Sequence, residues 1–182
     1  VEGILPDLAP DQPIISSLLS IEGEELAVTV IGMGNPHCVI FCKTLFPKEK
    51  DQLQGYFPEH LKKTALAIQS HPLFPESVNV EFVKVLKEDL VETLVYERGC
   101  GPTLACASGA AAVVVAGILT NCLAREVTVR LPGGELLVSW SEDDRRVAIK
   151  GRAAEVFSGV IRLDLEGPVA NGSQSAREVR LS

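Results

Sequence analysis

Positive charge is scarce in this sequence: 17 lysines and arginines stand against 24 aspartates and glutamates in 182 residues. The formal net charge of −7 argues against nucleic acid or an anionic membrane surface as the main partner. Long hydrophobic runs are also missing, because the longest, residues 105–119, is too short and too rich in small residues to span a bilayer. Since no secretory signal is visible either, we expect a globular protein of the cytoplasm or of a plastid.

Disulfide, metal and nucleotide motifs are missing as well. The five cysteines are an odd number and do not resemble a secreted disulfide framework, so a reducing compartment is expected. No Cys/His spacing matches a zinc site, and neither a G-x-G-x-x-G nor a P-loop pattern occurs. We therefore predict no metal and no cofactor. The cysteines are Cys38, Cys42, Cys100, Cys106 and Cys122.

The strongest chemical signal is the stretch ERGCGPTLACASGAAAVVVAG, residues 97–117, which places Cys106 where a turn of small residues opens into an apolar helix. Unpaired N–H groups and the helix dipole at such a start favour a thiolate over a thiol. The same N–H groups can bind a substrate carboxylate. A buried structural cysteine is the ordinary alternative. The glycines of the stretch permit close backbone approach, which favours a site, and Ser108 is a candidate helix cap.

Five more polar residues are candidates for the same site. Asn35 and His37 are two apart on an extended GNPH segment, so they share a face, and a histidine can orient a nearby thiol. A turn asparagine and a core histidine are the alternative. Asn79 lies in an expected strand, where asparagine is disfavoured and often marks a site. Glu97 and Arg98 end a strand and point to opposite sides, so one can face the site, unless both form surface ion pairs.

The pattern of apolar residues predicts one central helix inside a sheet. The helix expected over residues 108–119, with Asn121 as its C-cap, has no polar face and must be buried all round. The predicted fold is therefore α+β, with a mostly antiparallel, barrel-like sheet wrapped around a central apolar helix. Residues 1–15 are expected to be a linker, 16–165 one domain and 166–182 a disordered tail. A second helix is expected over 58–69, and strands over 26–31, 37–41, 78–86, 91–98, 126–131, 136–141, 147–150 and 156–163.

Three motifs, MGNPH, NVEFV and YERGxGxTxACxSGA, occur in this order and resemble the C-terminal half of diaminopimelate epimerase over residues 31–163. The closing GRAAEVFSGVIRL is similar to the last segment of that family. The resemblance implies two similar domains with a small amino-acid substrate between them, and no cofactor. Each domain supplies one cysteine at a helix start. One thiolate removes the α-proton and the other thiol returns a proton to the opposite face, which converts LL- to meso-diaminopimelate in lysine biosynthesis.

The resemblance also implies roles for individual residues. Cys106 matches the second catalytic cysteine, and Glu97 and His37 lie near the reacting centre and assist the thiols. Ala107 stands where the family usually has glycine, which is tolerable if its φ is negative. The residues implied to bind the substrate are Asn35, Asn79 and Arg98 at its distal end, and the backbone of Ala107 and Ser108 at the reacting carboxylate.

The first cysteine motif of the family, of the type MCGNGxR, does not occur in this sequence. Together with a start at Val1 rather than Met, this indicates the C-terminal half of an epimerase whose N-terminal domain is missing. We expect this half to be inactive alone. Without that domain, residues 156–163 would form an exposed edge, which predicts a homodimer or a strand-paired assembly. Two alternatives stay open. One is a racemase or isomerase of the same fold, of the phenazine-biosynthesis or proline-racemase type. The other is a non-catalytic domain that binds a ligand or partner.

Overall fold

The computed structural model describes residues 14–43, 57–143, 146–163 and 177–181, and the chain divides into two compact units, 1–151 and 152–182. All the candidate site residues belong to the first unit. No helix among the described residues has the length and apolarity needed to cross a membrane.

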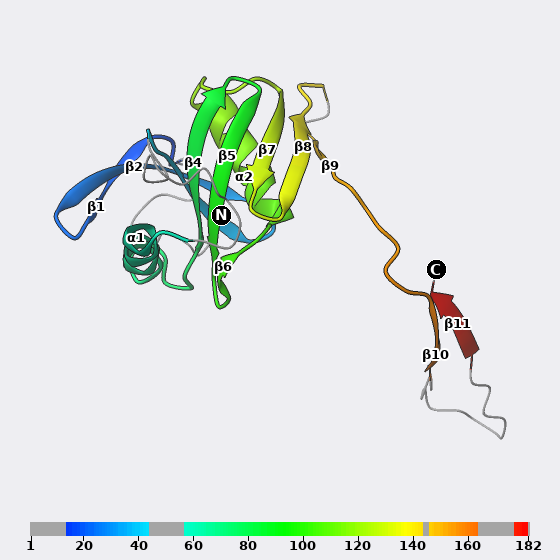
Figure 1. The fold of residues 1–182 in the computed structure, drawn as a ribbon. Coiled ribbons are helices and arrows are strands. Elements are labelled where there is room, and N and C mark those ends of the chain that lie inside the picture. Colours follow the sequence, from blue (N-terminus) through cyan, green and yellow to red (C-terminus); the bar gives the residue numbers. More distant parts are fainter. Residues whose placement is uncertain (1–13, 44–56, 144–145, 164–176, 182) are drawn as a thin grey trace. The chain divides into compact units, whose positions relative to one another are not determined.

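One sheet of nine strands makes up most of the first unit (Figure 1). Its order is β1-β2-β3-β4-β5-β7-β8-β9, and the short β6 pairs with β5. The β3–β4 and β5–β7 pairs are parallel and the other neighbours are antiparallel, which confirms a mostly antiparallel α+β fold. The strands are β1 Ser17–Ile21, β2 Glu24–Gly32, β3 Pro36–Phe41, β4 Asn79–Lys87, β5 Leu90–Glu97, β6 Gly101–Thr103, β7 Glu126–Leu131, β8 Gly134–Trp140 and β9 Val147–Lys150.

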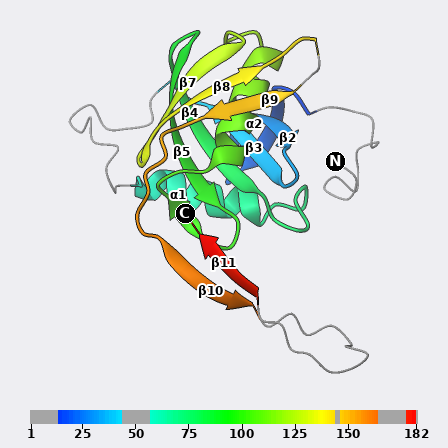
Figure 2. The ribbon, with the colours of Figure 1, turned by 90° about the vertical axis from the view of Figure 1, so that its right-hand side faces the viewer.

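The sheet curves around helix α2, Ala107–Leu119, as Figures 1 and 2 show from two sides. The helix contacts β2, β3, β4, β7, β8 and β9, and every residue from 109 to 117 is buried. Burial stabilises a valine side chain such as Val113 or Val114, both with no exposed surface, by about 1.5–3 kcal/mol. The absence of a polar face in the sequence therefore correctly predicted the central helix.

Helix α1, Glu59–Gln69, buries Leu61, Ala65 and Ile68 and contacts β1 and β4. These three residues form a second core with Val80 and Phe82 of β4. Because one core covers each face of β4, all residues from 79 to 83 are buried, including the polar ones. The two faces of this strand are therefore not an inner face and a solvent face, because both are covered.

Both ends of α2 differ from the sequence expectation. The helix begins at Ala107, and Cys106 rather than Ser108 is its N-cap. A cysteine takes this place because its backbone is extended and its sulfur accepts the Gly109 N–H. The C-cap is Thr120 rather than Asn121, which follows it with a left-handed φ of 57°. Asparagine tolerates a left-handed φ better than most residues, so it occupies the first position after the C-cap.

The second unit contains an antiparallel pair, β10 Gly159–Leu163 and β11 Arg177–Leu181. The strand expected over 156–163 is thus shorter, and Val156 and Phe157, with 87% and 81% of their surface exposed, precede it. Part of the tail expected to be disordered, residues 177–181, is a strand because it pairs with β10. Residues 164–176 and 182 of that tail lie outside the described part, as do residues 1–13 of the expected linker.

Gly117 is expected to be the most sensitive position of α2 to added volume. A Cβ there would overlap the Leu123 side chain and lie 2.8 Å from its Cβ. Gly117→Ala should therefore lower the free energy of unfolding in urea by about 1–3 kcal/mol through overpacking, although alanine favours a helix by about 1 kcal/mol. In a Leu123→Ala background the same change should be neutral or stabilising. Equal destabilisation in both backgrounds would contradict this explanation.

Candidate active site

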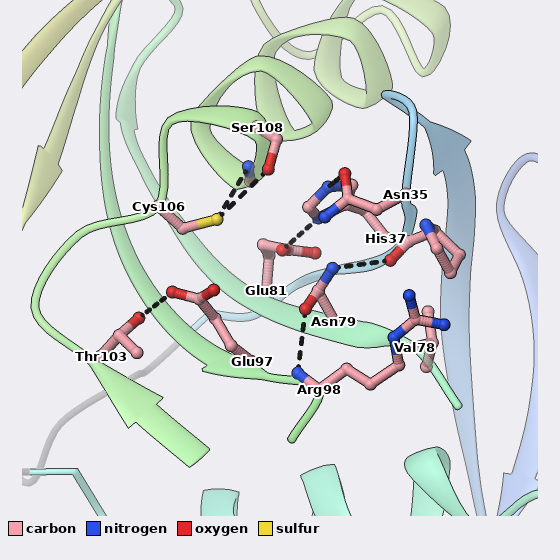
Figure 3. A network of polar contacts seen from close by, with 12 residues as sticks. Asn35, His37, Val78, Asn79, Glu81, Glu97, Arg98, Thr103, Cys106 and Ser108 are labelled. Carbon is pink, nitrogen blue, oxygen red and sulfur yellow. Dashed lines mark hydrogen bonds and ion pairs between the residues drawn. The ribbon is translucent and has the colours of Figure 1, made fainter. Parts of the chain in front are cut away.

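Cys106 lies at the start of α2 with its sulfur turned towards the first turn of the helix (Figure 3). Its Sγ accepts a hydrogen bond from the Gly109 N–H at 3.4 Å and lies 3.4 Å from the Ser108 Oγ. Only 9% of the residue is exposed. The N–H groups at a helix start have no partner within the helix, so the thiol and a set of anion-binding donors occupy the same place. Ala107 is the first residue of the helix and has no positive φ, so the backbone accommodates a side chain there.

The loop before Cys106 folds back onto β5 through the short strand β6. Gly99 and Gly101 have φ values of 79° and 80°, a region that favours glycine. This turn brings Thr103 opposite the end of β5, where its Oγ1 donates a 2.6 Å hydrogen bond to Glu97 Oε1. The Glu97 carboxylate is therefore held beside the loop that leads to Cys106.

Asn79 joins three strands at one end of the sheet. Its Nδ2 donates to the Pro36 carbonyl at 3.1 Å, and its Oδ1 accepts from the Arg98 N–H at 2.9 Å. The residue is only 4% exposed. Asparagine is disfavoured in strands, and here its amide ties the start of β3 to the residue after β5. Arg98 itself is exposed, and its Nη1 donates to the Glu76 carbonyl at 2.9 Å.

A chain of side chains runs from Asn35 through His37 to Glu81 (Figure 3). His37 is fully buried, with its Nε2 2.9 Å from Asn35 Oδ1 and its Nδ1 2.6 Å from Glu81 Oε1. Sequence reasoning missed Glu81. A signal was present, since Glu81 is two residues from Asn79 in β4 and therefore shares its face. Its contact with His37, which is 44 positions away in the sequence, depends on the parallel β3–β4 pairing.

Two buried groups have pKa values raised by their surroundings. Burial raises the pKa of the Glu81 carboxyl, and the negative charge of Glu97 adds to this, while the hydrogen bond and charge of His37 oppose it. Burial also raises the pKa of the Cys38 thiol. Cys38 lies in the second core, whereas Cys100 is exposed on the loop beside the site. Cys38 is therefore held as an unreactive thiol.

The predicted residues form one group at the end of the sheet that meets the start of α2 (Figure 3). No three His, Cys, Asp or Glu side chains in the described part of the chain are placed as metal ligands. What the arrangement offers is a thiol at a helix start, a buried histidine–carboxylate pair and several amide and guanidinium donors. The members of this group are Asn35, His37, Asn79, Glu97, Arg98, Cys106 and Ser108, with Glu81 and Thr103 in addition.

Comparison with known proteins points to one family. A family profile described as diaminopimelate epimerase matches residues 29–156. A diaminopimelate epimerase from Desulfitobacterium hafniense is 42% identical over 160 residues, which are 88% of this chain and 52% of that protein. One from Acaryochloris marina is 39% identical over 148 residues, which are 81% of this chain and 48% of that protein. The chain thus spans about half the length of the curated relatives it matches.

A solved structure shares the fold. The hydroxyproline epimerase from Agrobacterium vitis, crystallised with trans-4-hydroxy-L-proline, aligns with a TM-score of 0.53 at 14% identity. The alignment covers 74% of this chain and 44% of that chain. At this identity the similarity establishes the architecture alone, a curved sheet on a central helix.

Proposed function

Because the chain belongs to the diaminopimelate epimerase family, we propose that it is the C-terminal half of a cofactor-independent isomerase that inverts an α-carbon of diaminopimelate. The reaction is the conversion of the LL to the meso form in lysine biosynthesis, in the cytoplasm. The observation that carries the proposal is the position of Cys106, a thiol at the N-cap of a buried helix inside the matched region. Helix starts favour both thiolates and bound carboxylates.

Cys106 acts at one face of the α-carbon. As a thiolate it takes the α-proton and leaves a carbanion, and in the reverse direction the thiol returns a proton to that face. An α-proton beside a carboxylate is very weakly acidic, so the developing charge needs fixed donors. The backbone at Ala107 and Ser108, in the first turn of α2, supplies them to the reacting carboxylate. His37 and Glu97 lie close by and assist the proton transfer.

The distal amino-acid end of the substrate binds to Asn35, Asn79 and Arg98. Arg98 is exposed and the Glu76 carbonyl fixes its Nη1, so its planar group is oriented to hold a carboxylate. The Asn79 side chain uses one N–H and its oxygen in hydrogen bonds with backbone groups, and its second N–H is left to bind a ligand. A substrate with a second amino-acid head matches this donor set better than proline does.

The partner cysteine comes from an N-terminal domain. The relatives are about twice as long as the matched part, which supports a missing half. In the second unit Val156, Phe157 and Val160 expose 87%, 81% and 62% of their surface. Such apolar residues beside a short strand favour pairing with another chain. We expect them to contact the N-terminal domain in the whole enzyme, and to form a homodimer or strand-paired assembly in its absence.

Hydrogen exchange at the α-carbon tests the proposal. The chain is incubated with diaminopimelate in deuterated buffer, alone and with a separately produced N-terminal half. We expect epimerisation only in the mixture, because inversion needs a thiol at each face of the α-carbon, whereas the single thiol of this chain can exchange the α-proton only at its own face. If diaminopimelate neither binds nor undergoes exchange in either sample, the assignment is overturned. Binding without exchange in both samples would instead favour a non-catalytic domain. Turnover of proline but not of diaminopimelate would favour a racemase of the same fold.

A further inference from the structure

Glu81 is the one carboxylate without exposed surface among the residues the structure describes. Removing a carboxylate from water is costly unless it is paired, and Glu81 is paired through one oxygen only. Its Oε1 lies 2.6 Å from His37 Nδ1, and its Oε2 is buried without a hydrogen-bond partner. A group held at this cost in the middle of a sheet calls for a role other than packing.

The hydrogen-bond pattern shows which tautomer of His37 this chain of contacts requires. His37 Nε2 lies 2.9 Å from Asn35 Oδ1, which can only accept, so the contact is a hydrogen bond when Nε2 carries the hydrogen. His37 Nδ1 and Glu81 Oε1 then share one further proton across 2.6 Å. Both an imidazolium with a carboxylate and a neutral imidazole with a carboxylic acid satisfy this contact, and burial raises the pKa of the Glu81 carboxyl. In both forms the His37 ring presents Nε2–H to Asn35.

Glu81 also borders the reacting thiol. A Cβ placed on Gly109 would lie 2.9 Å from Glu81 Oε1 and 3.4 Å from Cys106 Sγ, so both groups pack against the same point of α2. Figure 3 shows the Glu81 carboxylate between the Cys106 sulfur and the His37 ring. A side chain at position 109 would crowd the carboxylate, so the glycine leaves room for it.

We propose that Glu81 is a positioning residue which, through His37, holds the Asn35 oxygen and so leaves the Asn35 NH2 group as a fixed donor for a carboxylate of the substrate. This rests on the proposed function. The reason is geometric, because an asparagine amide that is free to turn over presents an oxygen or a nitrogen equally well. An oxygen in that place would repel a carboxylate. Glu81 thus contributes to substrate affinity without touching the substrate.

Nitrogen-15 NMR of the histidine rings in the 182-residue chain tests the positioning without any substrate. His60 and His71 in the same spectrum serve as internal references, and His37→Asn identifies the His37 signals. We expect wild-type His37 to carry hydrogen on Nε2, with a strongly deshielded proton at the Nδ1–Glu81 contact. Glu81→Met, which keeps the length but removes both oxygens, should abolish that proton signal. A neutral His37 with hydrogen on Nδ1 alone would overturn the proposal.

Kinetics of the chain combined with its N-terminal half provide the second measurement. Glu81→Met should raise KM by about 10-fold, the loss of roughly one charged hydrogen bond, with a smaller effect on kcat. Glu81→Gln can still donate to Nδ1, so it should restore both KM and the Nε2–H signal. Thr93→Val is the matched control, since Thr93 is equally buried on the neighbouring strand and Val83 of β4 pairs with it.

The variants separate the possible outcomes. If Glu81→Gln is as impaired as Glu81→Met, Glu81 acts through its charge and the positioning role is wrong. If Glu81→Met does not fold, the wild-type and Glu81→Gln spectra still show whether His37 Nε2 carries hydrogen, and so still test the proposal. If the NMR results agree but the wild-type mixture shows no turnover, the proposed function fails while the positioning of His37 stands.

Discussion

Replacing Cys106 with serine should lower the rate of α-proton exchange in the combined enzyme by about 100- to 10,000-fold, the usual contribution of a general acid–base group. Serine is a preferred N-cap, so its hydroxyl can accept the Gly109 N–H that the sulfur accepts now. The helix start is therefore kept, while the base becomes a hydroxyl that does not ionise near neutral pH. Deuterium incorporation at the α-carbon, followed by mass spectrometry, measures the rate.

Two further variants separate chemistry from structure in this experiment. Cys106→Ala removes the cap as well, and should lose about 0.5–2 kcal/mol of stability in addition to the activity. Cys38→Ala is the control for the loss of a thiol elsewhere, because Cys38 is buried in the second core. Full activity of the serine variant, or an equal loss of activity in Cys38→Ala, would contradict the role of Cys106.

Asn79→Ala is expected to have the second largest effect, on stability and activity together. The change leaves the Pro36 carbonyl and the Arg98 N–H without partners in a place where Asn79 was only 4% exposed. Each buried group without a partner costs about 1–3 kcal/mol, so the loss of both partners should lower the free energy of unfolding by about 2–6 kcal/mol. Urea unfolding measures it, with the linear dependence on denaturant giving the value in water.

The control for this prediction is Thr93→Val, since the Thr93 hydroxyl is buried and has no hydrogen-bond partner. Replacing such a group by an apolar one of the same shape is near neutral or stabilising. Exchange activity of Asn79→Ala should fall even under conditions where the variant is folded, because the start of β3 and Arg98 lose their common anchor. Equal stabilities of the two variants would show that Asn79 does not hold the strands together.

The central helix and its reactive start could be predicted from sequence because both signals are local. An apolar run without a polar face demands burial, and Cys106 stands directly before that run. The hairpins are local as well, and β7 and β9 begin and end where the alternation predicts. Motif resemblance then identified the family, which the 42% identity to a relative confirms.

Glu81 and the cap of α2 could not be predicted in the same way. The role of Glu81 depends on which strand lies beside β4, and the parallel partner β3 is separated from it by α1. Cores cover both faces of β4, so it has no solvent face of the kind that period-2 patterning assumes, and polar residues 79 and 81 are buried on the face that they share with Val83 of the core around α2. At the helix start, Ser108 has the preferred capping chemistry, but the backbone turns two residues earlier, at residue 106.

The parallel pairing of β3 with β4 has a consequence for the order in which the molecule folds. Hairpins such as β4–β5 and β7–β8 close over short turns, whereas His37 and Glu81 are 44 positions apart in the sequence and meet only when β3 docks on β4. Closing such a loop costs more entropy than closing a turn, and contacts of this kind form late. We therefore expect the hairpins to form before β3 pairs with β4, so that the hydrogen bonds among Asn35, His37 and Glu81 form late in folding rather than in its nucleus.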